Sequence, residues 1–234
     1  LSGKELWRSL EDADVGYAPQ VIFTYGGVRQ LIVWHPSAVS SIDPTNGELF
    51  WEIPFPAKAG LTIATPRKSA NRLFVTAFYD GPLMLEVEGK SARLLWKGTS
   101  NSEVDTDGLH SIISTPFVDD THIYGVCSYG QLRCLNASSG NRLWETVEAT
   151  GKGRWWNAFL IPHEDRYFIH NEQGDLIIAN LSPSGYEEIS RAKLVEPTRP
   201  VNRRMTIWSH PAFAMKSVFA RNDKEIVRVD LSEK

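Results

Sequence analysis

The stretch Gly130-Gln-Leu-Arg-Cys-Leu-Asn-Ala-Ser-Ser-Gly-Asn-Arg-Leu-Trp144 contains two short apolar runs on either side of a turn. The turn, Asn136 to Gly140, is rich in residues that favour tight turns, and each flanking run has the length of a β-strand. Two further runs of strand length, Ile112 to Val118 and His122 to Ser128, lie just upstream. This region therefore predicts four antiparallel strands joined by short loops, with no helix.

The same pattern recurs along the chain with a period of about 48 residues. Prolines that follow a small or apolar stretch are spaced by 47, 50, 46 and 49 residues: Pro19, Pro66, Pro116, Pro162 and Pro211. A second series is spaced by 44, 45 and 48 residues: Trp7, Trp51, Trp96 and Trp144. Two markers with one period indicate internal repeats. We place them at about 9–54, 55–98, 99–146, 147–194 and 195–234, within a single domain that covers 1–234.

Four-stranded units of this length predict an all-β fold, a β-propeller of four-stranded antiparallel blades with about five blades present. A four-stranded sheet cannot bury both of its faces alone, so each blade must pack against its neighbours. We therefore assign a structural role to the periodic tryptophans, which end each repeat on the outermost strand and can fill the wedge between two blades. The residues concerned are Trp7, Trp51, Trp96 and Trp144.

The quoted stretch, and likewise Ala38 to Trp51, resembles the pyrroloquinoline quinone (PQQ) type propeller repeat, whose pattern is roughly Gly-x-Leu-x-Ala-Leu-Asp-x-x-Thr-Gly-x-x-x-Trp. The resemblance covers essentially the whole chain. Such repeats build quinoprotein dehydrogenases and also cofactor-free scaffolds such as BamB of bacterial outer-membrane assembly. The resemblance implies an exported protein of the periplasm or cell envelope, and a ring of seven or eight blades.

The two ends of the sequence bear on the size of the ring. Residues 1–8 have the pattern of an outer strand without its three inner strands, and the last repeat ends after three strands. Either these ends complete one blade of a five-bladed ring, or residues 1–8 belong to an upstream blade. The absence of an initial Met and the size of the resembling proteins favour the second alternative, in which the chain is the C-terminal part of a larger ring.

Composition excludes several classes of function. The chain has 25 basic and 28 acidic residues, a net charge of −3, so it lacks the positive potential that non-specific nucleic-acid binding uses. No apolar run is long enough for a membrane-spanning helix. Cys127 and Cys134 lack the spacing of a zinc site, and we expect two buried thiols, with a cross-strand disulfide as the alternative. We expect no metal site and a monomer.

One group of polar and aromatic residues stands out in the loops that enter the first strand of each repeat. Arg154 and Arg203 both lie eight residues before their proline, which predicts equivalent positions in neighbouring blades. Converging Arg, Trp, His and Asn side chains could bind an anion, a sugar or a carboxylate-bearing peptide at the mouth of the channel. The alternative is a structural role, with the arginines solvated or paired with Asp105 and Asp107. The candidate residues are His110, Arg154, Trp155, Asn157, Arg203, Trp208 and His210.

Two functions follow from the resemblance. The first is a non-catalytic scaffold that binds protein partners through its edges and loops and needs no cofactor. The second is a PQQ- and calcium-dependent alcohol dehydrogenase whose site lies partly in other blades. The sequence has no adjacent cysteine pair of the kind that such dehydrogenases often carry, and this favours the scaffold.

Overall fold

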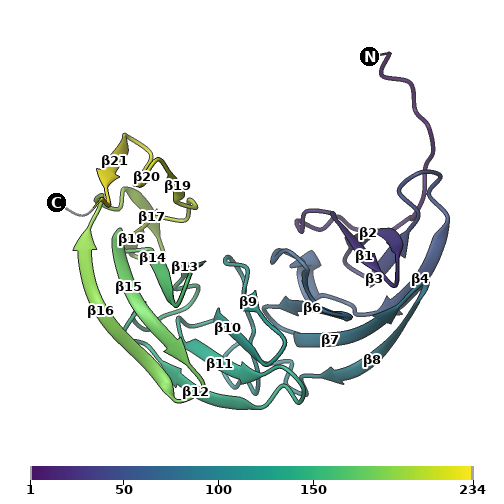
Figure 1. Ribbon diagram of the computed structural model, residues 1–234, viewed down its shortest axis with the longest axis horizontal. Helices are drawn as coiled ribbons and strands as arrows, with labels where there is room; N and C mark the ends of the chain where they lie inside the picture. Colours follow the sequence, from purple (N-terminus) through teal and green to yellow (C-terminus); the bar gives the residue numbers. More distant parts are fainter. Residues whose placement is uncertain (1, 233–234) are drawn as a thin grey trace.

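In the computed structural model, which describes residues 2–232, the chain forms six antiparallel sheets placed one after another along an open arc (Figure 1). Four sheets are complete blades, and in each the strands follow one another from the inner to the outer side. Their bounds are Val21–Tyr25 (β1), Val28–Trp34 (β2), Ala38–Ile42 (β3) and Leu49–Pro54 (β4); Arg67–Ser69 (β5), Arg72–Ala77 (β6), Gly81–Glu88 (β7) and Ser91–Lys97 (β8); Phe117–Val118 (β9), His122–Val126 (β10), Leu132–Asn136 (β11) and Arg142–Thr146 (β12); Ala158–His163 (β13), Arg166–Asn171 (β14), Asp175–Ser182 (β15) and Gly185–Lys193 (β16).

The fifth unit differs from the other four. A short hairpin precedes a three-stranded sheet, and the bounds are Arg199–Val201 (β17), Arg204–Thr206 (β18), Ala212–Ala214 (β19), Ser217–Arg221 (β20) and Ile226–Asp230 (β21). The prediction of an all-β propeller with about five blades is confirmed. The hairpin was not predicted. Within residues 2–232 the sole helical element is a 3-10 turn at Lys58–Gly60, and no helix is long and apolar enough to cross a membrane.

Each complete blade has one irregularity at the same place, the pairing of its third and fourth strands. The register shifts at Ser41/Ile42, Met84/Leu85, Cys134/Leu135 and Ile178/Ala179. An extra residue at a bulge bends the strand and increases its twist. The repeated bulge therefore turns every outer strand in the same way, as neighbouring blades require if they are to pack around an axis.

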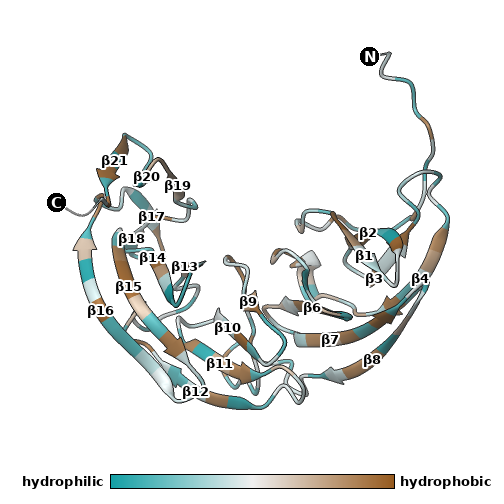
Figure 2. Ribbon diagram, in the orientation of Figure 1, coloured by the Kyte–Doolittle hydropathy of each residue, from teal (hydrophilic) through white to brown (hydrophobic). Residues whose placement is uncertain are grey.

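The hydrophobic core lies between blades. One cluster joins Ile32 and Trp34 of the first blade to Leu73 and Leu85 of the second, and equivalent clusters fill the next two junctions. Figure 2 shows brown, hydrophobic segments on central strands such as β7 and β15, whereas the outer strand β16 carries long teal stretches. Burial between sheets explains why a single repeat could not fold by itself.

The periodic tryptophans lie where one blade meets the next. Trp96 Nε1 donates to the carbonyl oxygen of Ala137 at 2.9 Å, and Trp144 Nε1 donates to that of Ser182 at 2.7 Å. In both pairs the acceptor belongs to the following blade. Trp51 is buried in the core between the first two blades and donates to Gln30 at 3.1 Å. Trp96 and Trp144 therefore join neighbouring blades through hydrogen bonds as well as packing, whereas the hydrogen bond of Trp51 stays within its own blade.

A glycine in the turn before the outer strand makes room for the tryptophan ring. A Cβ added to Gly140 would lie 2.7 Å from Cε3 of Trp96, and one added to Gly47 would lie 2.7 Å from Cε3 of Trp7. Both glycines have positive φ, which side-chain-bearing residues rarely adopt. Trp7 thus packs on the first blade as Trp96 packs on the third.

The strand expected over 1–8 does not form in residues 2–8, and Leu1 lies outside the described residues. A β-strand is stabilised by backbone hydrogen bonds to a neighbouring strand, and this segment does not run alongside one (Figure 1). The segment and β21 lie at opposite ends of the arc, so they do not pair. Cys127 and Cys134 are both buried free thiols, as expected. They are not opposite each other, because Cys134 pairs with Tyr124 in the β10–β11 register.

Candidate functional site

The connections between blades and the turns between second and third strands lie on the same face of the propeller, which we call the loop edge. This follows from the strand order: in an antiparallel sheet, the chain enters the first strand and turns from the second to the third at the same end. Arg154 lies in the connection 147–157 and donates to Glu103 in the connection 98–116 and to Tyr79 after β6. Tyr129 after β10 donates to the same Glu103. Side chains from three blades therefore meet in one cluster, which we call the Arg154 cluster.

Arg154 and Glu103 form a two-pronged salt bridge. Nε donates to Oε1 at 2.8 Å and Nη2 donates to Oε2 at 2.6 Å, a planar match that suits arginine and carboxylate. The Tyr129 hydroxyl donates to the same carboxylate at 2.9 Å, and the guanidinium lies 4.5 Å from the centroid of the Trp155 ring. The hydrogen bond from Arg154 lowers the pKa of Glu103. Arg154 is thus paired with Glu103 rather than with Asp105 or Asp107.

His110 is not at the surface of the loop edge. It is fully buried between the second and third blades, where Nδ1 lies 3.2 Å from the carbonyl oxygen of Phe78 and Nε2 lies 3.4 Å from Oδ1 of Asp107. Burial lowers the pKa of His110, and the bond to Asp107 opposes this shift. Asp107 also accepts hydrogen bonds from Thr99 and Ser100, so it fastens the loop that covers the histidine.

A second cluster, the Glu172 cluster, joins the fourth blade to the fifth. Glu172 follows β14 and is 1% exposed, and its carboxylate forms a salt bridge with Arg204 of β18. Nε1 of Trp208 donates to Oε2 of the same carboxylate at 2.9 Å. The Arg204 guanidinium lies 5.2 Å from the centroid of the Trp156 ring. The buried carboxylate of Glu172 therefore accepts hydrogen bonds from the hairpin and from the segment between β18 and β19.

The register of β13 and β14 places further candidates at the same junction. The Asn157 carbonyl accepts from the Glu172 amide, and Phe159 is paired with His170. His210 packs on Phe159 with ring centroids 3.8 Å apart. Buried side-chain nitrogens of Asn157 and His170 have no hydrogen-bond partner in the described structure. Burial lowers the pKa of both His170 and His210.

The seven predicted residues therefore do not form one group. Arg154 and Trp155 belong to the Arg154 cluster, whereas Asn157, Trp208 and His210 lie at the junction of the fourth and fifth blades. Arg203 is exposed on the β17–β18 turn and has no side-chain partner among residues 2–232. The carboxylates that organise both clusters, Glu103 and Glu172, were missed, because no motif or spacing marks them.

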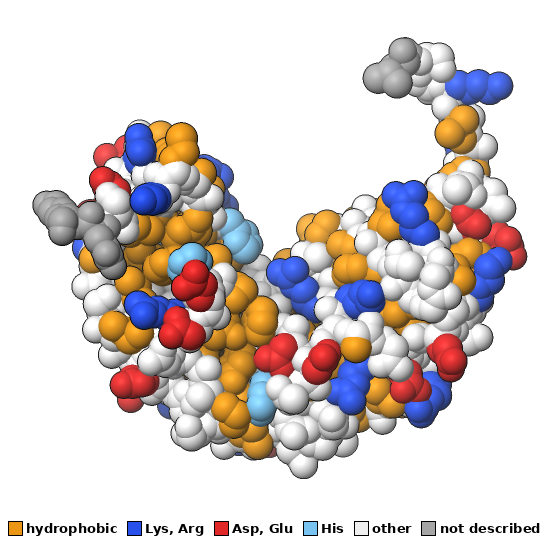
Figure 3. All heavy atoms as spheres, in the orientation of Figure 1, with side chains coloured by type: hydrophobic (Ala, Val, Ile, Leu, Met, Phe, Trp, Pro, Cys, Tyr) orange, Lys and Arg blue, Asp and Glu red, His pale blue; other side chains and the backbone are white. Residues whose placement is uncertain are grey.

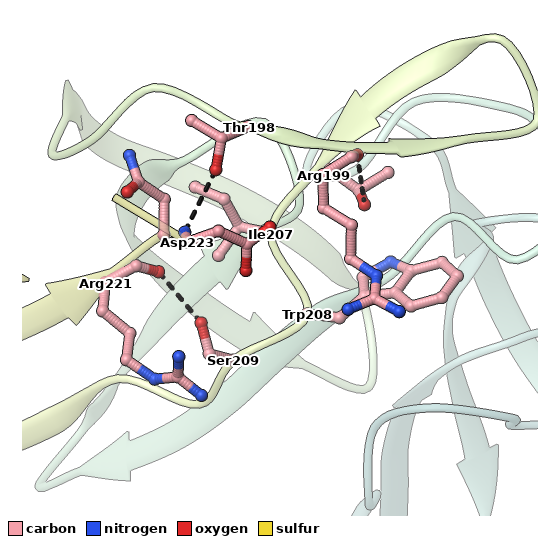
Figure 4. Close-up of a pocket in the computed structure, with 9 residues that line it drawn as sticks. Thr198, Arg199, Ile207, Trp208, Ser209, Arg221 and Asp223 are labelled. Atoms are coloured by element: carbon pink, nitrogen blue, oxygen red, sulfur yellow. Dashed lines mark hydrogen bonds between the residues drawn. The ribbon is translucent and has the colours of Figure 1, made fainter. Parts of the chain in front are cut away.

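The fifth unit also contains a cavity of about 300 Å³ between the β17–β18 hairpin and the β20–β21 turn (Figure 4). Arg199 and Arg221 line it together with Trp208 and Ser209. The Ser209 hydroxyl donates to the carbonyl oxygen of Arg221 at 2.9 Å, and the Asp223 amide donates to Thr198 Oγ1 at 3.1 Å. These bonds hold both walls of the cavity.

A calcium-bound quinone needs a set of side-chain oxygens around one cation. Within residues 2–232, no three His, Cys, Asp or Glu side chains lie close enough to hold a metal ion. The carboxylates of the two clusters are already bonded to arginine. Residues 2–232 therefore do not fit a PQQ–calcium group.

The four complete blades, with a tryptophan at each junction and polar loops at one edge, define a β-propeller of PQQ-type repeats. A family model described as outer membrane protein assembly factor BamB matches residues 35–234, so the chain belongs to that family. No curated protein sequence matches the chain.

Solved structures show the same fold. BamB from Moraxella catarrhalis has a TM-score of 0.60 and 14% identity, over 94% of this chain and 59% of that one. The quinohemoprotein alcohol dehydrogenase ADHIIG from Pseudomonas putida HK5 has a TM-score of 0.64 and 12% identity, over 96% of this chain and 42% of that one. The computationally designed Ika8 protein has a TM-score of 0.63 and 12% identity, over 98% and 63%. The chain thus spans less than two thirds of each.

Proposed function

We propose that this protein is a non-catalytic scaffold of the bacterial cell envelope, exported to the periplasm, which binds protein partners in outer-membrane protein assembly. The observation that carries the proposal is the match of 35–234 to the BamB family. The likeness to an alcohol dehydrogenase is a likeness of fold, because propellers serve many unrelated functions.

The loop edge has properties that suit a rigid binding surface. The Arg154 cluster joins loops of three blades through charged hydrogen bonds, so these loops keep their positions without a ligand. A surface that is ordered before binding loses less conformational entropy when a partner docks. On the face seen in Figure 3, Lys and Arg are interspersed with Asp and Glu, so no single charge dominates there. Such a surface suits a specific protein contact better than a polyanion.

The test is binding of purified outer-membrane assembly proteins to the immobilised chain, with the designed Ika8 propeller as a control of the same fold. We expect saturable binding to at least one assembly protein and none to the control. Equal binding to both propellers, or none to either, would overturn the scaffold function. Incubation with PQQ and Ca²⁺ provides a second arm, in which a retained chromophore with dye-linked alcohol oxidation would contradict the non-catalytic part.

A further inference from the structure

We propose that the cavity between the β17–β18 hairpin and the β20–β21 turn binds a carboxylate group of an acidic protein segment. This inference names a ligand chemistry beyond the scaffold function, and it can be tested without the identity of the partner. Its basis is the juxtaposition of two unneutralised arginines, Arg199 and Arg221, on one cavity of about 300 Å³.

The charges around the cavity favour an anion. Arg199 and Arg221 are exposed, and neither guanidinium has a hydrogen-bond or ion-pair partner among residues 2–232. Arg204, on the same hairpin, is by contrast neutralised by the buried Glu172. The lining residues carry two arginines against one carboxylate, Asp223, which leaves a net positive charge. Two guanidinium groups are well suited to a carboxylate, because each presents paired N–H donors in one plane.

The walls of the cavity are held in place independently of any ligand. The salt bridge between Glu172 and Arg204 and the indole hydrogen bond from Trp208 attach the hairpin to the fourth blade. Thr206, at the end of β18, is 1% exposed, and its hydroxyl donates to the carbonyl oxygen of Arg199 at 3.2 Å. In Figure 4 the Arg199 side chain ends beside Trp208 and the Arg221 side chain ends beside Ser209, so the two arginines line different sides of the cavity. The backbone walls of the site are thus in place before a ligand binds, and the ordering cost is confined to the two arginine side chains.

The hairpin itself points to a specialised use. The four complete blades pass from one sheet to the next without it, whereas the connection into the fifth unit inserts β17 and β18. Its turn places Asn202 and Arg203 at φ of 47° and 68°, a left-handed conformation that is unfavourable for arginine. Binding residues are often carried on loops that a rigid scaffold positions. The hairpin supplies Arg199 to the lining of the cavity.

The experiment uses the whole chain, labelled with ¹⁵N, and follows the arginine Nε–Hε and Ser209 amide signals by NMR. The probes are an acetylated and amidated Ala-Glu-Ala peptide, the same peptide with Gln in place of Glu, and inorganic phosphate. We expect saturable shifts at Arg199, Arg221 and Ser209 with the Glu peptide, and at least about tenfold weaker binding of the Gln peptide. Equal binding of both peptides, or no saturable shift, would overturn the proposal. Phosphate that binds as tightly as the Glu peptide would overturn the assignment to a carboxylate.

Variants separate a ligand role from a structural one. R199Q and R221Q should each weaken the Glu peptide at least about tenfold, while R203Q, on the same hairpin but outside the cavity, should leave it unchanged. D223N removes the one negative charge in the lining, so it should tighten binding. A purely structural role of these residues predicts no gain from D223N. Unchanged affinity in R199Q and R221Q, with a native unfolding midpoint, would contradict the site, and it would leave binding of assembly proteins as a separate question.

Discussion

The Arg154 and Glu172 clusters are built from the same parts and differ in burial. Each pairs one arginine with one glutamate beside a tryptophan, and each connects neighbouring blades. In the first, the side chains of Arg154 and Glu103 are 38% and 22% exposed, whereas in the second those of Arg204 and Glu172 are 17% and 1% exposed. The same kind of ion pair is therefore exposed to solvent at one junction and largely shielded from solvent at the other.

This difference decides what each cluster contributes. An ion pair near solvent is screened and adds little to stability, typically below about 1 kcal/mol. A buried pair does not add much relative to an apolar replacement, but removal of one partner leaves a desolvated charge, which costs about 3 to 5 kcal/mol. Loss of one partner of the Glu172 cluster should therefore weaken the attachment of the fifth unit, while the Arg154 cluster mainly fixes loop positions.

The largest effect is expected from Glu172→Gln. The amide keeps the shape of the side chain and can still accept from Trp208, but it leaves the Arg204 guanidinium without its counter-charge. We expect a loss of about 3 kcal/mol in the free energy of unfolding, measured with urea, and faster hydrogen exchange over β17 to β20. The double variant Glu172→Gln with Arg204→Met should recover part of the loss. A loss below about 1 kcal/mol would mean that water reaches this junction as it reaches Arg154.

The next effect is a dependence on pH that arises from three histidines at the blade junctions. Burial lowers the pKa of His110, His170 and His210 in the native state. The unfolded chain binds protons at these groups near their ordinary pKa of about 6.5, before the native chain does, so stability falls as pH decreases from 7.5 to 5.5. Arg67 faces His210 and adds to its shift, whereas Asp175 opposes that of His170.

The measurement is the urea midpoint at pH 7.5 and 5.5. His170→Gln should reduce the fall in the urea midpoint, because the variant lacks one group that binds protons more readily in the unfolded chain than in the native chain. The matched control is His122→Gln, at a half-buried position on β10. An equal midpoint at both pH values in the unmodified chain would show that these histidines bind protons equally well in both states.

Sequence patterns predicted the blades because the signals for strands and tight turns are local. The turn from Asn136 to Gly140 and the tryptophan at 144 specify two strands and the packing of the blade edge within 15 residues. The β17–β18 hairpin was missed because its strands are only three residues long, too short to show the alternation that marks a half-buried strand. Its contact with the fourth blade is made through Glu172, which lies 32 residues from Arg204 in the sequence.

The same reason explains the wrong equivalence of Arg154 and Arg203. Both lie eight residues before a proline, but Pro162 is inside β13 whereas Pro211 precedes β19. The connection into the fifth unit also contains the hairpin. The same spacing from a proline therefore places the two arginines at different positions in the fold. Arg154 reaches the loops of the second and third blades, and Arg203 lies on an exposed turn. Long connections follow no repeat, and only tertiary contacts place their side chains.

The smallest effect is expected from Glu103→Gln, the counterpart of Glu172→Gln in the exposed cluster. The change removes the charge that faces Arg154, but the guanidinium keeps access to water and its contact with the Trp155 ring. We expect a loss of less than about 1 kcal/mol in the free energy of unfolding, measured with urea, and this loss should shrink further in high salt because exposed charges are screened. The loop edge should respond more than the fold: hydrogen exchange should rise in the connections 98–116 and 147–157 and remain unchanged over β17 to β20. A loss equal to that of Glu172→Gln would show that the Arg154 cluster is as isolated from solvent as the buried one, and the contrast in burial would then not explain the two junctions.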